Sequence, residues 1–155
     1  MATEIERKFL ITDDSWRDSV QRCRQMRQGY LISDEQRSVR VRVTDDGAHL
    51  NIKSATVGPS RSEYEYPIPR QDGEELLDRL CKQPLLEKTR HWVPYGDHLW
   101  EIDVFEGANQ GLIVAEVELT SVDQPFERPD WVGEEVTDDK RYYNSCLAEH
   151  PYRDW

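Results

Sequence analysis

The chain of 155 residues has few cysteines, a minority of bases and no long apolar run. No stretch approaches the roughly 20 apolar residues that a membrane-spanning helix needs, and the first residues are acidic rather than signal-like, so we expect no membrane partner. Lysine and arginine number 20 against 31 aspartates and glutamates, a net charge of −11. This balance disfavours a nucleic-acid partner, because phosphate backbones attract clustered bases.

The three cysteines, Cys23, Cys81 and Cys146, are odd in number and form no CxxC pair. Scattered thiols of this kind are typical of reduced, structural cysteines, and they predict a cytoplasmic location. A GxxxxGK[ST] loop is also absent, and none of the four histidines belongs to an HxH or HExxH pair. These absences exclude a Walker-type phosphate loop and leave the histidines without a metal-binding motif.

The aromatic residues supply enough rigid apolar area for a folded chain. Five tryptophans, seven tyrosines and three phenylalanines argue against disorder. At roughly 100–200 residues per domain, the length predicts one domain over residues 1–155.

Alternation of apolar and polar residues predicts eight strands separated by turn-forming residues. They span 3–11, 29–32, 38–44, 48–54, 61–68, 86–94, 98–105 and 112–120. Helices are expected over 15–24, from an N-cap at Asp72 to about residue 81, and over about 138–150. Segment 121–137 is expected to be a lid or a long surface loop. Hairpin-length links favour an α+β fold, with a mainly antiparallel sheet and helices packed outside it.

Charged residues alternate along these strands, so each strand places its charges on one side of the sheet. The eight carboxylates on this side are Glu4, Glu6, Glu63, Glu65, Glu101, Asp103, Glu116 and Glu118. The seven bases are Lys8, Arg40, Arg42, Lys53, Arg61, Lys88 and Arg90. On a single strand this pattern is typical of a solvated face. Taken together, however, these faces hold almost no Ser, Thr or Gln, and their charges come in blocks of one sign.

If the sheet closes with these faces inward, the interior is charged and must stay wet, because unpaired buried charge is costly. Arginine forks and lysine ammonium groups bind phosphate oxygens. Clustered carboxylates are the hard ligands that Mg²⁺ or Mn²⁺ prefers. The pattern therefore predicts a site for a polyanion that is bound together with one or two divalent cations.

The segment Glu4-Ile5-Glu6-Arg7-Lys8 fits the ExExK signature of the CYTH family, the triphosphate tunnel metalloenzymes. The resemblance spans the chain and is to the short bacterial members. The later motifs, in the family's order, are Arg40-Val41-Arg42, Ile52-Lys53, Glu63-Tyr64-Glu65, Lys88-Thr89-Arg90, Glu101-Ile102-Asp103 and Glu116-Val117-Glu118. This resemblance implies an eight-stranded antiparallel β tunnel, a closed barrel with flanking helices, that binds a triphosphate and uses a divalent metal.

The resemblance also implies roles for the charged residues. The bases that would grip phosphate are Lys8, Arg40, Arg42, Lys53, Lys88 and Arg90. The carboxylates that would hold metal are Glu4, Glu6, Glu116 and Glu118, with Glu63 and Glu65 contributing metal or water contacts. The implied reaction is hydrolysis of a phosphoanhydride, in which positioning and electrostatics replace a covalent nucleophile.

Five further residues are weaker candidates. Tyr30 could donate a proton at the tunnel mouth, although packing explains it as well. Arg61 could pair with the acids and leave fewer of them for metal. Glu101 and Asp103 complete the acidic set, and Lys140 could close one tunnel end or lie in solvent.

We expect an inorganic triphosphatase that cleaves tripolyphosphate to pyrophosphate and phosphate, because no motif for a nucleobase pocket is evident. The alternatives are a nucleoside or thiamine triphosphatase, a class IV adenylate cyclase and a non-catalytic polyphosphate-binding sensor. Retention of every glutamate pair favours an enzyme over a sensor. The outer apolar faces can support a homodimer, unless helices cover them.

Overall fold

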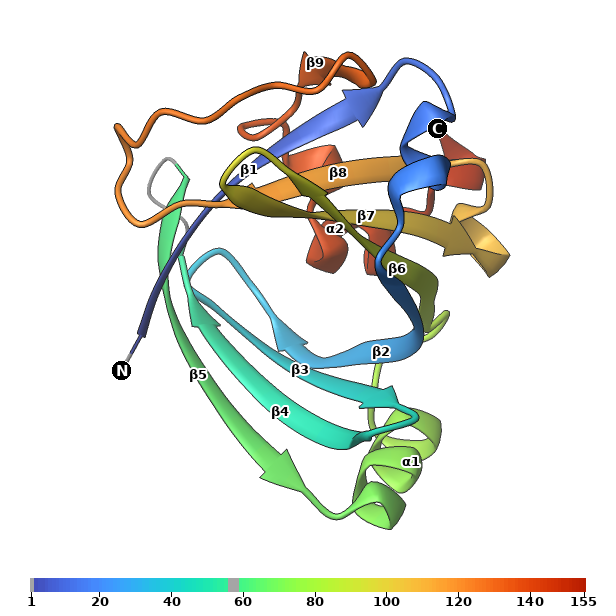
Figure 1. Cartoon of the computed structure of the whole chain (residues 1–155). Coiled ribbons are helices and arrows are strands. Elements are labelled where there is room, and N and C mark those ends of the chain that lie inside the picture. Colours follow the sequence, from blue (N-terminus) through green and yellow to red (C-terminus); the bar gives the residue numbers. More distant parts are fainter. Residues whose placement is uncertain (1, 56–58) are drawn as a thin grey trace.

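The strands form a closed antiparallel barrel, seen in the computed structural model, which describes residues 2–55 and 59–155 (Figure 1). The barrel strands are β1 (Ala2–Ile11), β2 (Arg22–Ser33), β3 (Arg37–Thr44), β4 (Gly47–Ser54), β5 (Ser60–Ile68), β6 (Leu86–Tyr95), β7 (His98–Glu106) and β8 (Ile113–Glu118). Their order is β5-β4-β3-β2-β6-β7-β8-β1, and β1 pairs with β5 to close the ring. The predicted eight-stranded barrel is confirmed.

Strand β1 joins the two ends of the barrel because different parts of it pair with different neighbours. Its first residues pair with β5, its middle pairs with β8, and Phe9 and Ile11 pair with a short additional strand, β9 (Val132–Glu135). Glu4, Glu6 and Lys8 alternate along this strand. The ExExK segment therefore presents its three charged side chains to one side while it bridges two neighbouring strands.

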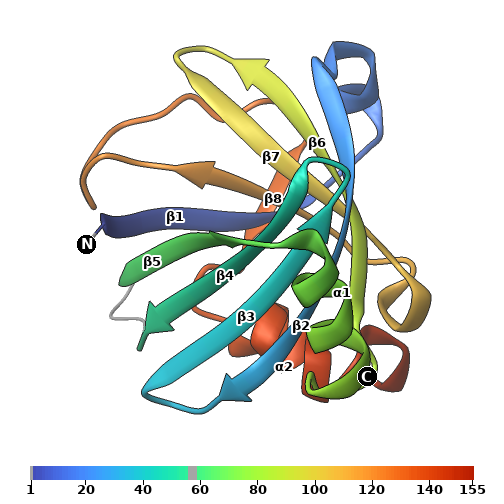
Figure 2. The same ribbon diagram turned by 90° about the horizontal axis from the view of Figure 1, so that it is seen from below.

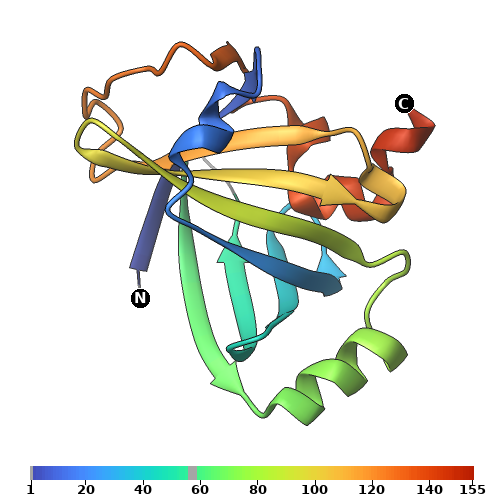
Figure 3. The same cartoon turned by 45° about the vertical axis from the view of Figure 1, so that its right-hand side comes forward.

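Helix α1 (Arg70–Arg79) packs on the outside of β3 and β4 (Figure 3). Its Leu77 is fully buried against Val41 and Val43. The helix begins two residues before the expected N-cap at Asp72, so that prediction was wrong. Pro69 precedes the helix and caps it without a side-chain hydrogen bond. Its fixed φ suits a helix entry.

Helix α2 (Asn144–Glu149) lies within the ring of strands, near β2 (Figure 2). Its Leu147 and Ala148 pack against Tyr30, Leu86 and Phe105, so one end of the barrel interior is apolar. The expected helix over 138–150 is therefore shorter than predicted and is preceded by a 3-10 turn. The 3-10 segments are η1 (Ser15–Ser19), η2 (Gly107–Asn109), η3 (Lys140–Tyr142) and η4 (Tyr152–Asp154).

Segment 119–131 runs over the outer face of the barrel. Its Phe126 and Trp131 pack edge-on against the buried Trp100, with ring centroids 5.9 and 5.5 Å apart. Trp16 of η1 extends the same cluster. Because this segment covers the outside of the sheet and leads into β9, it is a surface layer, and the lid interpretation was wrong.

The helix expected over 15–24 was also wrong. Only η1 is helical there, and β2 begins at Arg22, seven residues before the predicted strand. Residues Arg22–Gln28 pair with β6 along their whole length. The stripe of Trp16, Val20 and Cys23 mimicked a helical face, and sheet pairing overrode it. No helix in the described part of the chain is long and apolar enough to cross a membrane.

Candidate functional site

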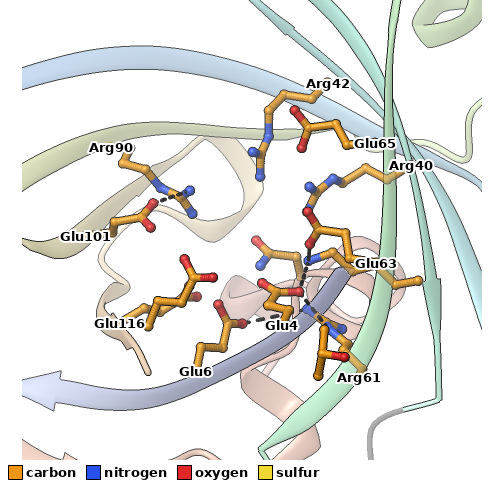
Figure 4. A pocket seen from close by; sticks show the side chains of 14 residues that line it. Glu4, Glu6, Arg40, Arg42, Arg61, Glu63, Glu65, Arg90, Glu101 and Glu116 are labelled. Atoms are coloured by element: carbon orange, nitrogen blue, oxygen red, sulfur yellow. Dashed lines mark hydrogen bonds and ion pairs between the residues drawn. The ribbon is translucent and has the colours of Figure 1, made fainter. Parts of the chain in front are cut away.

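Charged side chains line a cavity of about 220 Å³ inside the barrel (Figure 4). Twelve of the fifteen charged residues that alternation had placed on one face reach its wall: Glu4, Glu6, Arg40, Arg42, Lys53, Arg61, Glu63, Glu65, Arg90, Glu101, Glu116 and Glu118. Thr3 and Asn144 complete the described lining. The inward orientation of these faces follows from the closure of the sheet, because alternate side chains of every strand must point to the lumen.

The two signs of charge face each other across this cavity. Arg40 and Arg42 of β3 point into it from one side, and Glu6 of β1 and Glu116 of β8 point in from the other (Figure 4). We call these sides the arginine wall and the carboxylate wall. A ligand between them meets bases on one side and acids on the other, which is the arrangement that a phosphate chain with a bound cation requires.

The arginine wall is short of counter-charges. Arg42 donates from Nε to Oε1 of Gln28 at 3.0 Å, a neutral partner. Burial, together with Arg40 and Arg90, lowers the pKa of Arg42 to about 9. Arg40 is 5% exposed, and among the described residues its buried Nε has no hydrogen-bond partner. Buried donors without acceptors favour an anionic ligand.

The carboxylate wall has an excess of negative charge. Glu6 lies directly opposite Glu118 in the β1–β8 pair, and Glu101 lies opposite Glu116 in the β7–β8 pair. Like charges in such pairs destabilise a sheet. Burial, Glu116 and Glu4 raise the pKa of Glu6 well above its usual value, and burial, Glu4 and Glu101 raise that of Glu118. The wall is therefore suited to a cation.

Glu4 is paired with bases at the edge of the cavity. Its Oε2 lies 3.0 Å from Nζ of Lys53 and 3.3 Å from Nε of Arg61. Burial favours the neutral form of Glu4, but Lys53, a hydrogen bond with Glu63 and Arg61 outweigh it and lower the pKa. Arg61 also reaches Glu6, with Nη2 3.7 Å from Oε1. Burial lowers the pKa of Arg61, and Glu4 and Glu6 raise it by more.

Comparison with known proteins agrees with this geometry. The model of the CYTH domain matches residues 2–146. The chain belongs to the CYTH family.

Two relatives resemble the chain over nearly its full length. An inorganic triphosphatase from Acetivibrio thermocellus is 43% identical over 155 residues, which cover 100% of this chain and 99% of the relative. An inorganic triphosphatase from Nitrosomonas europaea is 40% identical over 151 residues, which cover 94% of this chain and 97% of the relative. A crystal structure of an inorganic triphosphatase superposes with a TM-score of 0.67 at 38% identity, covering 96% of this chain and 95% of the other.

Three of the expected site residues of this CYTH domain lie behind the cavity wall. Asp103 is 1% exposed and accepts hydrogen bonds from Nζ of Lys88 at 2.7 Å and from Nε and Nη2 of Arg90 at 2.8 and 3.0 Å. Burial lowers the pKa of Lys88 to about 7. Lys8 is 4% exposed, with Nζ 3.5 Å from Oε1 of Glu116. These residues support the wall from beneath.

Arg90 connects this buried layer to the cavity. Its Nη1 lies 2.5 Å from Oε2 of Glu101, while its other nitrogens bind Asp103. Burial lowers the pKa of Arg90, and Asp103 and Glu101 more than offset it, so the pKa is well above its usual value. Glu116 has a pKa of about 2, because Lys8 and Arg90 outweigh the effect of its burial. Both groups stay charged at neutral pH.

The remaining candidates lie in different places. Glu63 and Glu65 line the cavity. Oε2 of Glu65 accepts a hydrogen bond from Nδ2 of Asn51 at 2.8 Å. Tyr30 is 4% exposed in the apolar end of the barrel, among the side chains around α2, and does not line the cavity. Lys140 is exposed and lines a second cavity, described below.

Thr3, Asn144 and Gln28 are polar residues of the site that the sequence did not predict. Asn144, the first residue of α2, lines the cavity and accepts a hydrogen bond from Nζ of Lys88 at 3.3 Å. Gln28 is fully buried beside Arg42. Alternation along β2 would have found Gln28 if the strand had been extended to Arg22. No local pattern marks Asn144, because its position depends on how α2 enters the barrel.

The carboxylate wall offers oxygen donors, which hard divalent cations prefer. Within residues 2–55 and 59–155, no three acid, histidine or cysteine side chains are grouped closely enough to hold a metal by themselves. Mg²⁺ usually keeps several waters and takes one or two carboxylates plus phosphate oxygens. The opposed pair Glu6 and Glu118, with the raised pKa of each, fits a cation that shares its ligands with a phosphate.

Proposed function

We propose that the chain is a divalent-metal-dependent inorganic triphosphatase that hydrolyses tripolyphosphate to pyrophosphate and phosphate. The observation that carries this proposal is the arginine wall facing the carboxylate wall across one cavity (Figure 4). Two relatives named inorganic triphosphatase, aligned over nearly the whole chain, support the same conclusion.

The arginine wall binds the phosphate chain. Arg40 and Arg42 project from neighbouring positions on one side of β3, and Arg90 joins them from β6. Arginine forks can each bind two phosphate oxygens, which fixes the chain in one orientation. Because these groups are already held in the barrel, they stabilise the charge of the transferring phosphoryl group with little reorganisation.

The carboxylate wall would hold the metal through one or two of the carboxylates Glu6, Glu116 and Glu118, with phosphate oxygens and water as the other ligands. A bound Mg²⁺ or Mn²⁺ supplies charge neutralisation and lowers the pKa of a bound water. Lys8 and Asp103 keep the neighbouring Glu116 and Arg90 charged and in place.

Glu63 can assist the reaction by accepting a proton from water. Burial and the hydrogen bond with Glu4 raise the pKa of Glu63. A carboxylate with a raised pKa is a stronger base than an exposed glutamate. Nζ of Lys53 lies 3.4 Å from Oε2 of Glu63 and holds its side chain beside the cavity.

The alternatives in which the substrate carries adenine or thiamine, namely an adenylate cyclase and a nucleoside or thiamine triphosphatase, are less well supported. No aromatic side chain is among the described residues that line the cavity. Trp100 and Trp131 are buried in the outer apolar cluster. Trp92 lies under the guanidinium of Arg22, 4.2 Å from the ring centroid, so this face of the ring is already covered. Adenine or thiamine would therefore have to bind outside the cavity.

The test compares initial rates of phosphate release from tripolyphosphate, ATP and thiamine triphosphate, each with Mg²⁺, with Mn²⁺ and with EDTA. We expect the fastest release from tripolyphosphate and none in EDTA. Faster release from ATP or from thiamine triphosphate would show that this compound, and not tripolyphosphate, is the preferred substrate. No release from any of the three, with tripolyphosphate still raising the melting temperature, would favour the sensor.

A further inference from the structure

Arg61 lies where two cavities meet. It lines the charged cavity and also a second cavity of about 370 Å³. The second cavity lies between α2 and the β2–β3 hairpin, and Arg37, Lys140 and Tyr143 are among its lining residues. Among the described residues, Arg61 is the charged side chain that lines both cavities.

Within the charged cavity, Arg61 is bound to two acids of the ExExK segment. Its Nε lies 3.3 Å from Oε2 of Glu4 and its Nη2 lies 3.7 Å from Oε1 of Glu6. The side chain of Arg61 is 20% exposed, so water screens these contacts only in part. The guanidinium therefore supplies positive charge to both carboxylates.

Among the described residues, no second base is in ion-pair contact with Glu6. Nζ of Lys53 lies 3.0 Å from Oε2 of Glu4 and 3.4 Å from Oε2 of Glu63, and these two acids are its ion-pair partners among the described residues. Lys8 is bound to Glu116 instead. Among the described residues, Arg61 is thus the base in ion-pair contact with Glu6.

We propose that Arg61 is a resident counter-cation, which pairs with Glu4 and Glu6 in the metal-free protein and competes with the divalent ion for Glu6. When the ion binds together with its phosphate ligands, the guanidinium of Arg61 leaves Glu6 and moves toward the second cavity, where there is space for it. This inference rests on the proposed metal-dependent function. It explains why the acids are tolerated together in the absence of metal, and it makes metal binding to the free protein weak.

The experiment measures Mn²⁺ affinity of the substrate-free protein by titration calorimetry or by electron paramagnetic resonance of the unbound ion. We expect Arg61→Gln to bind Mn²⁺ at least about tenfold more tightly than wild type, because a competing charge is removed. Arg61→Lys should fall between the two, since an ammonium group cannot bridge both acids. The matched control, Arg37→Gln, removes another arginine of the second cavity that pairs with Asp34 and should leave the affinity unchanged.

Equal or weaker Mn²⁺ binding by Arg61→Gln would overturn the inference. If that variant does not fold, the Mn²⁺ affinity of Arg61→Lys is measured instead. An affinity no higher than that of the wild type overturns the inference. Hydrolysis of tripolyphosphate by the wild type, measured with Mn²⁺ and with EDTA, distinguishes failure of the proposed role of Arg61 from failure of the proposed metal-dependent function. If the wild type needs the metal for turnover but Arg61→Gln binds Mn²⁺ no more tightly, only the role of Arg61 is refuted. If turnover continues in EDTA, the metal-dependent function is refuted as well.

Discussion

At the scale of single residues, Glu6 combines a high electrostatic cost with a proposed role. It faces Glu118 across β1 and β8, and burial, Glu116 and Glu4 raise its pKa. We predict that Glu6→Gln lowers metal-dependent turnover of tripolyphosphate by about a hundredfold or more, on the scale of other lost charge contacts. The melting temperature should stay the same or rise, because the amide removes like-charge repulsion.

Phosphate release and thermal unfolding, measured on the same preparation, check this prediction. Normal turnover would remove Glu6 from the metal site. A large fall in the melting temperature would show instead that the carboxylate of Glu6 stabilises the fold through Arg61.

Asp103 is the residue whose loss should cost most stability. It is the buried acid between Lys88 and Arg90. Asp103→Asn leaves the buried Lys88 without its counter-charge and Arg90 with Glu101 alone, so we predict a loss of about 3–5 kcal/mol in the free energy of unfolding, measured by urea denaturation. Glu149→Ala is the control, because it removes an exposed pair with Lys82 and should cost below about 1 kcal/mol. Similar losses for both variants would refute the role given to Asp103.

Alternation along the strands could predict which residues face the lumen, because the side chains of a strand must alternate whatever its neighbours are. It could not predict that Lys88 and Asp103 lie behind the wall while Arg90 reaches the cavity. That difference depends on α2, whose Asn144 contacts Lys88. The motif order of the family supplies the roles but contains no information on such packing.

At the scale of elements, the contact of α1 with the barrel depends on one glycine. A Cβ at Gly73 would lie 2.6 Å from the Cβ of Ala48 and 3.1 Å from Cγ2 of Val43. Alanine is the better helix former by about 1 kcal/mol, but this clash forces α1 away from the sheet. We therefore predict that Gly73→Ala destabilises the protein by about 1–3 kcal/mol in urea denaturation.

The matched control on the same helix is Glu75→Ala, at an exposed position of α1. It should change the free energy of unfolding by less than about 0.5 kcal/mol. If Gly73→Ala were neutral or stabilising, α1 would have room to shift on β3 and β4.

Strands were easier to predict than helices. Seven of the eight strands were located within a few residues because their alternation is regular, as in β3 and β4. The start of β2 was missed because the spacing of Trp16, Val20 and Cys23 fits a helix as well. Strand β9 has only four residues, Val132–Glu135, and forms by pairing with β1. Its existence depends on a distant segment rather than on a local pattern.

At the scale of the whole molecule, most of the net charge of −11 lies outside the barrel, since the inward faces hold seven bases and eight acids. Segment 119–131 and α1 cover much of the outer apolar surface. Tyr64 and Tyr66 of β5 remain exposed. The homodimer therefore stays a prediction, with the outer side of β5 as one exposed surface that could support it.

The interior charges should make stability depend on pH. The folded-state pKa values of Asp103 and Glu116 are lowered, that of Glu116 from 4.5 to about 2. The contribution of Glu116 is thus complete above the unfolded value and is lost as the pH falls from 4.5 toward 2, and that of Asp103 is lost only below its ordinary pKa of 3.8. Glu6 acts in the opposite direction, because its raised pKa favours the protonated folded state.

We predict that the melting temperature falls over this acidic range, and that it falls less steeply in Glu116→Gln, which lacks one of the two linked groups. Differential scanning calorimetry between neutral pH and about pH 3 measures both slopes. Parallel slopes would mean that Glu116 does not contribute to the acid sensitivity.

Phosphorus NMR of tripolyphosphate in the presence of the protein and Mg²⁺ tests the proposed hydrolysis itself. We predict that tripolyphosphate disappears while pyrophosphate and orthophosphate form in equal amounts, and that EDTA stops the reaction. Intact tripolyphosphate after prolonged incubation with the folded protein, or consumption that continues in EDTA, would contradict it.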